Sequence, residues 1–290
     1  MPDDQGGLIL VHAHPDDEAF GTGGLIARTV AEGRRVDLVI CTGGEEGEIH
    51  DPTLDQDEAK PRLQEIREAE LRSSVAALQG NGPGELHLHM LGYRDSGMMG
   101  TPSNDRDDVF WHADLDEAAR KVGDIIREAR PAVMVSYDAN GNYGHPDHIN
   151  AHRVAVAAWD AADDTLAKLY ETAFNRDRWS RLTAEMQARG IKLPWDEDEE
   201  EGPESAEEEE FGVAEADMTT TIDVAAFAPA KHAAMDCHKT QRQDMGWLLD
   251  LPDDLKADAS SPEYFVLKRW RGREIPAGYR ETSLFDGLDG

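Results

Sequence analysis

Apolar residues recur along the first 165 positions in two alternating patterns, which together predict a layered α/β fold. Short apolar, β-branched runs predict strands at residues 7–12, 36–41, 86–91 and 132–137. Apolar residues spaced three and four apart predict helices at residues 19–33, 61–78, 115–130 and 147–162. This alternation is typical of right-handed βαβ units, which form a parallel sheet with helices on both faces.

The pattern becomes less regular beyond residue 165. Strands are expected at residues 169–174, 219–224 and 264–270, and helices at residues 177–189 and 229–245. We therefore expect a Rossmann-like, three-layer αβα catalytic core with a mostly parallel sheet over residues 1–165. A smaller carboxyl-terminal α+β extension, residues 166–290, is expected to complete the sheet and form one wall of the site.

A nucleotide-binding fingerprint does not follow the first predicted strand. The nearest match, Gly21-Thr22-Gly23-Gly24, falls inside the first predicted helix. Glycines there more often allow close packing of a helix on a sheet, because the fingerprint is informative only at a strand-to-helix turn. Dinucleotide binding is therefore not expected.

The charge of the chain excludes several classes of partner. Sixty acidic and 29 basic side chains give a formal net charge of −31, which repels nucleic acid and anionic membrane surfaces. Part of the excess lies in an acidic insert at residues 196–210, which is typical of a solvated, disordered loop. Adaptation of the host to salt is an alternative explanation of the acidity, and the sequence leaves both open.

Cysteine content and hydropathy favour a cytoplasmic protein. Only Cys41 and Cys237 occur, and they form no Cys-x-x-Cys pair, so disulfide scaffolds and thiolate zinc fingers are not expected. The first seven residues carry no basic or apolar targeting pattern, and no apolar run approaches membrane-spanning length. The sequence does not indicate the oligomeric state.

Two similar tetrapeptides carry the candidate chemistry. His14-Pro15-Asp16-Asp17 follows the first predicted strand, and His145-Pro146-Asp147-His148 follows the fourth. Proline suits the first position of a helix, so each motif is expected at a strand-to-helix junction. If each helix begins at its proline, the histidine before it lies at the cap, one turn away from Asp17 or His148. Metal-binding side chains then converge at the carboxyl edge of the sheet, where α/β folds place their sites.

The residue types point to a catalytic metal centre. Two neutral imidazoles and one carboxylate, with a fourth position open to water, are typical of catalytic rather than structural Zn²⁺. If Asp17 is a ligand, the adjacent Asp16 is free to act on that water. The alternative is that both acids merely complement the dipole of a helix, but the histidines of the second motif argue against it. The same donors suit Fe²⁺.

Three segments together resemble one enzyme family. They are Ala-His-Pro-Asp-Asp-Glu at residues 13–18, Cys-Thr-Gly-Gly-Glu-Glu-Gly-Glu at residues 41–48, and the stretch from Tyr137 to His148. The chain resembles the zinc-dependent N-acetylglucosaminyl deacetylases of the PIG-L/LmbE-like family. It is most similar to the mycothiol branch, which contains a biosynthetic deacetylase and an S-conjugate amidase.

The resemblance implies a role for each matching residue. It implies Zn²⁺ ligands at His14, Asp17 and His148, and a general base at Asp16. It further implies that His145, in its protonated form and oriented by Asp147, stabilises the oxyanion or protonates the amine, and that Tyr143 donates a hydrogen bond to the same oxyanion. The matching substrate-binding residues are Glu48, Arg67 and Asp95. For Arg67, an ordinary helix-surface ion pair with Glu65 or Glu70 is the alternative.

The expected function is removal of acetyl from an N-acetylglucosamine conjugate, with N-acetylglucosaminyl-inositol favoured. Cleavage of the cysteinyl-glucosamine amide of mycothiol S-conjugates and deacetylation of another amino sugar or a secondary metabolite are the alternatives within this chemistry. A non-catalytic metal- or sugar-binding module is the alternative from another class. Such a module has no need of Asp16 beside an open metal position.

Overall fold

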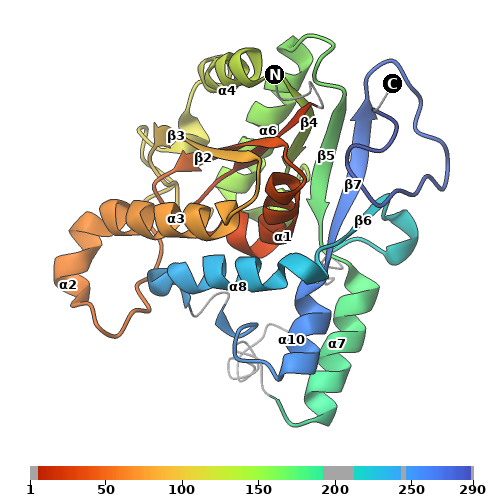
Figure 1. Ribbon diagram of the computed structural model, residues 1–290. Coiled ribbons are helices and arrows are strands. Elements are labelled where there is room, and N and C mark those ends of the chain that lie inside the picture. The colour runs from red at the N-terminus through yellow and green to blue at the C-terminus, as the bar shows by residue number, and fades with distance from the viewer. Residues whose placement is uncertain (1–5, 192–211, 243–245, 289–290) are drawn as a thin grey trace.

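Seven strands form one sheet in the order β3-β2-β1-β4-β5-β7-β6, seen in the computed structural model of Figure 1. The structure describes residues 6–191, 212–242 and 246–288, so the acidic insert at 196–210 lies outside the described residues. The strands are β1 (Gly7–His12), β2 (Arg35–Thr42), β3 (Glu85–Tyr93), β4 (Pro131–Ser136), β5 (Lys168–Ala173), β6 (Thr220–Asp223) and β7 (Pro262–Trp270).

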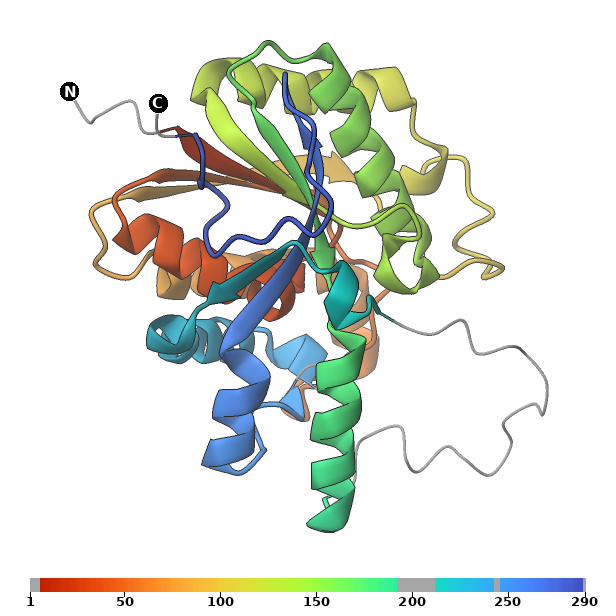
Figure 2. The ribbon, with the colours of Figure 1, turned by 90° about the vertical axis from the view of Figure 1, so that its right-hand side faces the viewer.

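Helices cover both faces of this sheet. They are α1 (Asp17–Ala31), α2 (Gln56–Ala59), α3 (Leu63–Gln79), α4 (Leu115–Ala129), α5 (Gly141–Gly144), α6 (Pro146–Ala161), α7 (Arg176–Ala188), α8 (Ala228–Cys237) and α10 (Asp253–Ser260). Helices α1, α3 and α8 lie on one face, and α4 and α6 lie on the other (Figures 1 and 2). The predicted αβα fold with a mostly parallel sheet is confirmed.

Alternation along β1 explains why there are two apolar layers. Leu8 and Leu10 belong to the core beneath α1, α3 and α8, whereas Ile9 and Val11 belong to the core beneath α4 and α6. Successive side chains of a strand point to opposite faces, so a strand buried on both sides is apolar throughout. Every residue of β1 is buried.

The strand order brings the two histidine motifs together. β1 pairs in parallel with β2 on one side and with β4 on the other. The chain therefore leaves neighbouring strands at the same edge, at residues 13–17 after β1 and at residues 137–148 after β4. The order reverses between β1 and β4, which is the topological position where open α/β sheets bind ligands.

Among the carboxyl-terminal strands, β7 runs opposite to the parallel core, whereas β5 and β6 run in the same direction as the core. β7 is antiparallel to both β5 and β6. Helices α7 and α10 lie side by side beyond the end of these strands (Figure 2), where Leu182 and Met186 pack with Leu251 and Leu255. The prediction of a helix at 229–245 was wrong in extent, because α8 ends at Cys237. Helix α10 was not predicted.

Gly24 of α1 serves packing, as predicted, whereas Gly21 does not. A Cβ atom at Gly24 would lie 2.6 Å from the side chain of Val224, whereas one at Gly21 would meet nothing within 4 Å. Gly24 thus lets α1 approach the segment that follows β6. Across the described residues, the helices lack the combined length and apolar character that crossing a bilayer requires.

Candidate active site

His14, Asp17 and His148 meet at the carboxyl edge of β1 and β4. The Nδ1 atom of His14 lies 3.2 Å from Nε2 of His148. The Asp17 carboxylate lies 3.6 Å from that His14 nitrogen and 3.5 Å from that His148 nitrogen. Segments more than 130 positions apart in the sequence thus bring three metal-type donors together.

These distances fit one small cation. Ligand atoms bound at about 2.0–2.1 Å in tetrahedral geometry lie about 3.3 Å from each other, close to all three separations. Donor atoms of His14, His145 and His148, and those of His14, Asp95 and Asp147, also lie within 4.8 Å of one another. The set of His14, Asp95 and Asp147 would use the other nitrogen of His14, because Asp147 contacts Nε2 and not Nδ1.

The charges around the cluster favour a bound cation. Burial alone would lower the pKa of His14, but the carboxylates of Asp95, Asp147 and Asp17 outweigh burial and raise it to about 9. Burial alone would raise the pKa of Asp17, but His148 and His14 outweigh burial and hold it well below its usual range. Burial lowers the pKa of His148 to about 4, so this ring is neutral and has a lone pair to offer.

Two residues behind the cluster orient its ligands. The Asp147 carboxylate lies 3.2 Å from Nε2 of His14 and accepts hydrogen bonds from the N–H and hydroxyl of Ser96. A proton on Nε2 leaves the Nδ1 lone pair of His14 for a metal, an arrangement common at histidine ligands. The Tyr137 hydroxyl accepts the N–H of Ala13 at 2.8 Å and donates to Asp17 at 2.7 Å. The sequence predicted no role for Tyr137.

Asp16 lies beside the cluster and is paired with a buried arginine. An Nη atom of Arg67 donates to the Asp16 carboxylate at 3.0 Å and to the carbonyl of Pro15 at 2.7 Å. Burial, opposed by Arg67, raises the pKa of Asp16 to about 7. Arg67 is only 3% exposed, so the alternative of an ordinary helix-surface pair with Glu65 or Glu70 is wrong.

The backbone of Asp16 is strained. Its φ is 137°, a value that residues with a Cβ atom rarely adopt and that costs about 1–3 kcal/mol. Its N–H donates to Glu18 at 2.9 Å, and Glu18 in turn contacts His238 at 2.7 Å. Helix α1 consequently begins at Asp17. The expectation that it begins at Pro15 was wrong. His238 was not predicted at the site, because it lies far from both motifs in sequence and belongs to no recognisable motif.

At the second motif the helix begins at its proline, as predicted. His145 is the cap of α6, and its Nδ1 accepts the N–H of Asp147 at 3.1 Å. Asp147 therefore contacts His145 through its backbone and His14 through its carboxylate. Burial and the neighbouring rings of His14 and His148 lower the pKa of His145 to about 3.

The expectation of a protonated His145 therefore does not fit its surroundings. An Nδ1 atom that accepts a hydrogen bond assigns the proton of the neutral ring to Nε2. A neutral His145 still has one N–H to donate.

A polar cavity of 770 Å³ opens over the cluster. Tyr143 is 54% exposed at its mouth, with its hydroxyl 3.5 Å from Nε2 of His148. Asp95 is buried and accepts the N–H of Gly97 at 2.8 Å. The Glu48 side chain is 83% exposed. The predicted residues that line the cavity are His14, Asp16, Asp17, Glu48, Arg67, Asp95, Tyr143 and His145.

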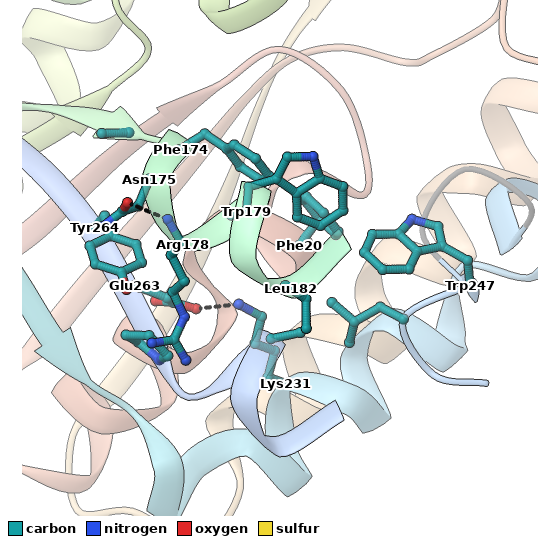
Figure 3. Close-up of a pocket in the computed structure, with 15 residues that line it drawn as sticks. Phe20, Phe174, Asn175, Arg178, Trp179, Leu182, Lys231, Trp247, Glu263 and Tyr264 are labelled. Carbon is teal, nitrogen blue, oxygen red and sulfur yellow. Dashed lines mark hydrogen bonds and ion pairs between the residues drawn. The ribbon is translucent and has the colours of Figure 1, made fainter. Parts of the chain in front are cut away.

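A smaller, mainly apolar cavity of 110 Å³ shares Phe20 with the polar one. Figure 3 shows its aromatic lining, which includes Phe174, Trp179 and Trp247. At its edge Lys231 points toward Glu263, and the two form a buried ion pair of 2.7 Å (Figure 3). Helix α8 is thereby tied to β7 next to the site.

Comparisons with known proteins identify the family of the chain. Residues 9–159 match the model of the PIG-L family, described as GlcNAc-PI de-N-acetylase. The chain is 44% identical over 290 residues to the 1D-myo-inositol 2-acetamido-2-deoxy-alpha-D-glucopyranoside deacetylase of Acidothermus cellulolyticus, an alignment that covers 97% of this chain and 95% of the relative.

Solved structures with the same fold are more distant in sequence. The N,N'-diacetylchitobiose deacetylase of Pyrococcus horikoshii is 18% identical with a TM-score of 0.52, over 91% of this chain and 84% of the other. The 4-carboxy-2-hydroxymuconate hydratase of Pseudomonas putida is 17% identical with a TM-score of 0.56, over 93% and 99% of the two chains. Because one of these enzymes is a hydratase, the fold alone does not decide the reaction.

Proposed function

Because this chain belongs to the PIG-L family, we propose that it removes the acetyl group from N-acetylglucosamine linked to inositol, with Zn²⁺ as its metal. The chain is a deacetylase, a hydrolase that acts on amide bonds. The inositol conjugate is proposed because the relative that is 44% identical carries that substrate in its name. Zn²⁺ is proposed because two imidazoles and one carboxylate suit it, although Fe²⁺ suits the same donors.

One observation carries the proposal. Donor atoms of His14, Asp17 and His148 lie 3.2 to 3.6 Å apart, and the carboxylate of a fourth residue, Asp16, lines the same cavity. Hydrolysis at a metal requires three protein ligands and a nearby carboxylate that does not bind the metal. A divalent cation held there lowers the pKa of a water molecule and polarises the substrate carbonyl.

We assign the proton transfer to Asp16. Its pKa of about 7 lies near neutrality, where a carboxylate both accepts a proton from the attacking water and returns it to the leaving amine. Arg67 holds the carboxylate from behind at 3.0 Å, so the other oxygen is available to the cavity. Asp16 is thus proposed as base and then as acid.

Two donors are proposed for the oxyanion that develops on the acetyl group. Tyr143 offers a hydroxyl near His148, and neutral His145 offers its Nε2–H. Donors placed where negative charge develops typically contribute about 10²-fold or more in rate. Neither residue needs to carry a charge for this role.

Recognition of the sugar and inositol is assigned to the polar wall of the cavity. Glu48 is the most available acceptor, since its carboxylate is largely exposed. Arg67 and Asp95 also line the cavity, although both are already engaged by protein partners. Hydroxyl-rich ligands need such paired donors and acceptors, because unmatched buried polar groups are costly.

A paired assay tests the proposal. The protein, freed of metal and reloaded with Zn²⁺ or Fe²⁺, is given N-acetylglucosaminyl-inositol in one reaction and a mycothiol S-conjugate in the other. We expect acetate to be released from N-acetylglucosaminyl-inositol faster than a mercapturate is released from the S-conjugate, and only when the metal is present. Faster release of a mercapturate would instead indicate the amidase, and failure of both reactions with every metal would contradict the proposal.

A further inference from the structure

Glu18 follows the two aspartates of the first motif, and its carboxylate is completely buried. One carboxylate oxygen accepts the backbone N–H of Asp16 at 2.9 Å. The other oxygen accepts the Ser74 hydroxyl at 2.5 Å and lies 2.7 Å from Nε2 of His238. An ionised carboxylate has only acceptors, so every partner of Glu18 is a donor.

These contacts fix Asp16 at its backbone. Its φ of 137° is a conformation that an unconstrained aspartate leaves readily. The bond to Glu18 holds the N–H of Asp16, while Arg67 holds its carboxylate at 3.0 Å. With one anchor at each end, the carboxylate has a defined direction toward the metal cluster.

His238 brings a distant part of the chain to this anchor. It directly follows α8, and Lys231 lies seven residues earlier, about two helical turns away. Lys231 pairs with Glu263 (Figure 3). Glu263 also accepts the N–H groups of Gly24 and Leu25 in α1, at 2.9 and 2.8 Å. Helix α8 is therefore linked to α1 at two places. Glu263 makes the link near Gly24, and His238 makes the link at Glu18 in the first turn of α1.

We propose that Glu18 and His238 are positioning residues that hold the Asp16 carboxylate in the direction from which it exchanges protons with the attacking water. This inference rests on the proposed function, because Asp16 is the base there. Both residues act through Asp16 and lie behind it, with His238 completely buried.

Glu18→Gln and His238→Ala test the anchor from its two sides. Glutamine keeps one acceptor oxygen and replaces the other with an NH₂ group, so either the Asp16 N–H or the pair of Ser74 and His238 loses the acceptor that Glu18 provides. We expect kcat to fall about 10- to 100-fold in both variants, since small misplacements of a catalytic group have effects of that order. KM and the metal content should stay within about twofold of the wild type, because neither residue contacts substrate or metal.

A conservative variant distinguishes positioning from simple support of the fold. His238→Gln places an amide N–H near the former Nε2, so kcat should recover to within about threefold of the wild type. His232→Ala is the matched control, because His232 lies on α8 and contacts Ser260 at 2.7 Å, away from Asp16. This control should keep the wild-type kcat.

Hydrogen exchange at the Asp16 amide gives a readout without substrate. In the metal-loaded protein followed by NMR, exchange at this amide should be about tenfold or more faster in Glu18→Gln and His238→Ala, and unchanged in His232→Ala. If the variants show this exchange pattern but the wild type has no deacetylase activity, the proposed function is contradicted, while the positioning of Asp16 by Glu18 and His238 is supported. Folded, metal-loaded His238→Ala with the wild-type exchange rate and kcat would overturn the inference, as would an equal loss of kcat in His238→Ala and His238→Gln.

Discussion

At the scale of single residues, the site depends on which nitrogen of each histidine carries a proton. Asp147 sets this for two of them, because its carboxylate contacts Nε2 of His14 while its N–H donates to Nδ1 of His145. His14 is thereby prepared to bind a cation through Nδ1, and His145 to donate from Nε2. One aspartate thus gives two neighbouring rings different tasks.

The adjacent residues Asp16 and Asp17 provide a matched pair of variants. Asp16→Asn should lower kcat about 10²- to 10⁴-fold and leave the bound metal near its wild-type amount, because the base is lost but no ligand is. Asp17→Asn should lose most of the metal, because a charged ligand is removed. Metal analysis and acetate release on both variants check this. Equal loss of metal in the two would contradict the assignment.

Asp37 should make the free energy of unfolding depend on pH in the acidic range. Burial alone would raise the pKa of this carboxyl, but hydrogen bonds from His89 and Arg35 outweigh burial and lower it. A lowered pKa stabilises the fold above the unfolded value near 4, and this contribution is lost as the pH falls through the folded value. Asp37→Asn should cost about 1–3 kcal/mol at pH 7 and less at pH 3, which lies below the unfolded value, as measured by urea unfolding.

Exposed Asp107 provides the control for that experiment. Asp107→Asn should change the free energy of unfolding by less than about 0.5 kcal/mol at either pH. A cost of Asp37→Asn that is the same at pH 7 and pH 3 would contradict the assignment of the pKa.

Residue types at the two motifs indicated that metal-type side chains meet at one edge of the sheet. The choice of His14, Asp17 and His148 as the ligands came from the family resemblance and stays a prediction. Tyr137 and His238 were not identifiable as contacts of the site, because a lone tyrosine or histidine has many ordinary roles. Their partners, Asp17 and Glu18, lie far away in sequence, so only the fold reveals these pairs.

At the scale of elements, two similar motifs start their helices differently. Helix α6 begins at Pro146 with His145 as its cap, which is what the fixed φ of proline predicts. Helix α1 begins two residues after Pro15, because Asp16 adopts a positive φ that ends helical geometry there. That conformation depends on contacts with Arg67 and Glu18 and is therefore invisible to local propensity.

Two glycines of α1 should respond in opposite ways to the same change. Gly24→Ala should destabilise the protein by about 1–3 kcal/mol, because the added methyl meets Val224 at 2.6 Å. Gly21→Ala has free space and should stabilise it by up to about 1 kcal/mol, because alanine favours a helix. Thermal unfolding of both variants measures this. A similar shift in the two would show that packing at Gly24 is not the constraint.

The helical prediction at 229–245 extends too far. Residues 238–244 carry no apolar side chain, and α8 ends at Cys237, followed by a 3-10 turn at Lys239–Gln241. That turn places buried His238 against Glu18 and lets the Gln241 amide donate to the carbonyl of Glu48. The polar residues after α8 therefore make tertiary contacts at the active site that local sequence does not reveal.

At the scale of the whole molecule, the sheet is continued by strands that the parallel core does not require. A buried cluster attaches the last turn-rich segment to this part of the sheet. Glu281 accepts hydrogen bonds from Lys168 at 2.7 Å, Tyr170 at 2.5 Å, Thr220 at 2.9 Å and Tyr279 at 2.7 Å. Lys168 is completely buried, so its charge depends on this partner.

Glu281→Ala should therefore be strongly destabilising. It leaves a buried lysine without its carboxylate, a change that costs about 3–5 kcal/mol. Glu274→Ala is the control, because Glu274 is an exposed acid of the same segment and should change stability by less than about 0.5 kcal/mol. Chemical unfolding measures both variants. Equal effects would mean that the cluster does not hold the carboxyl-terminal segment on the sheet.

The account as a whole depends on two distant segments sharing one ion, and anomalous diffraction at the zinc absorption edge tests this directly. Crystals of the Zn²⁺-loaded protein should show one peak about 2.0–2.2 Å from Nδ1 of His14, Nε2 of His148 and the Asp17 carboxylate. A peak held instead by Asp95 and Asp147, or none in the cavity at full zinc loading, would contradict the account.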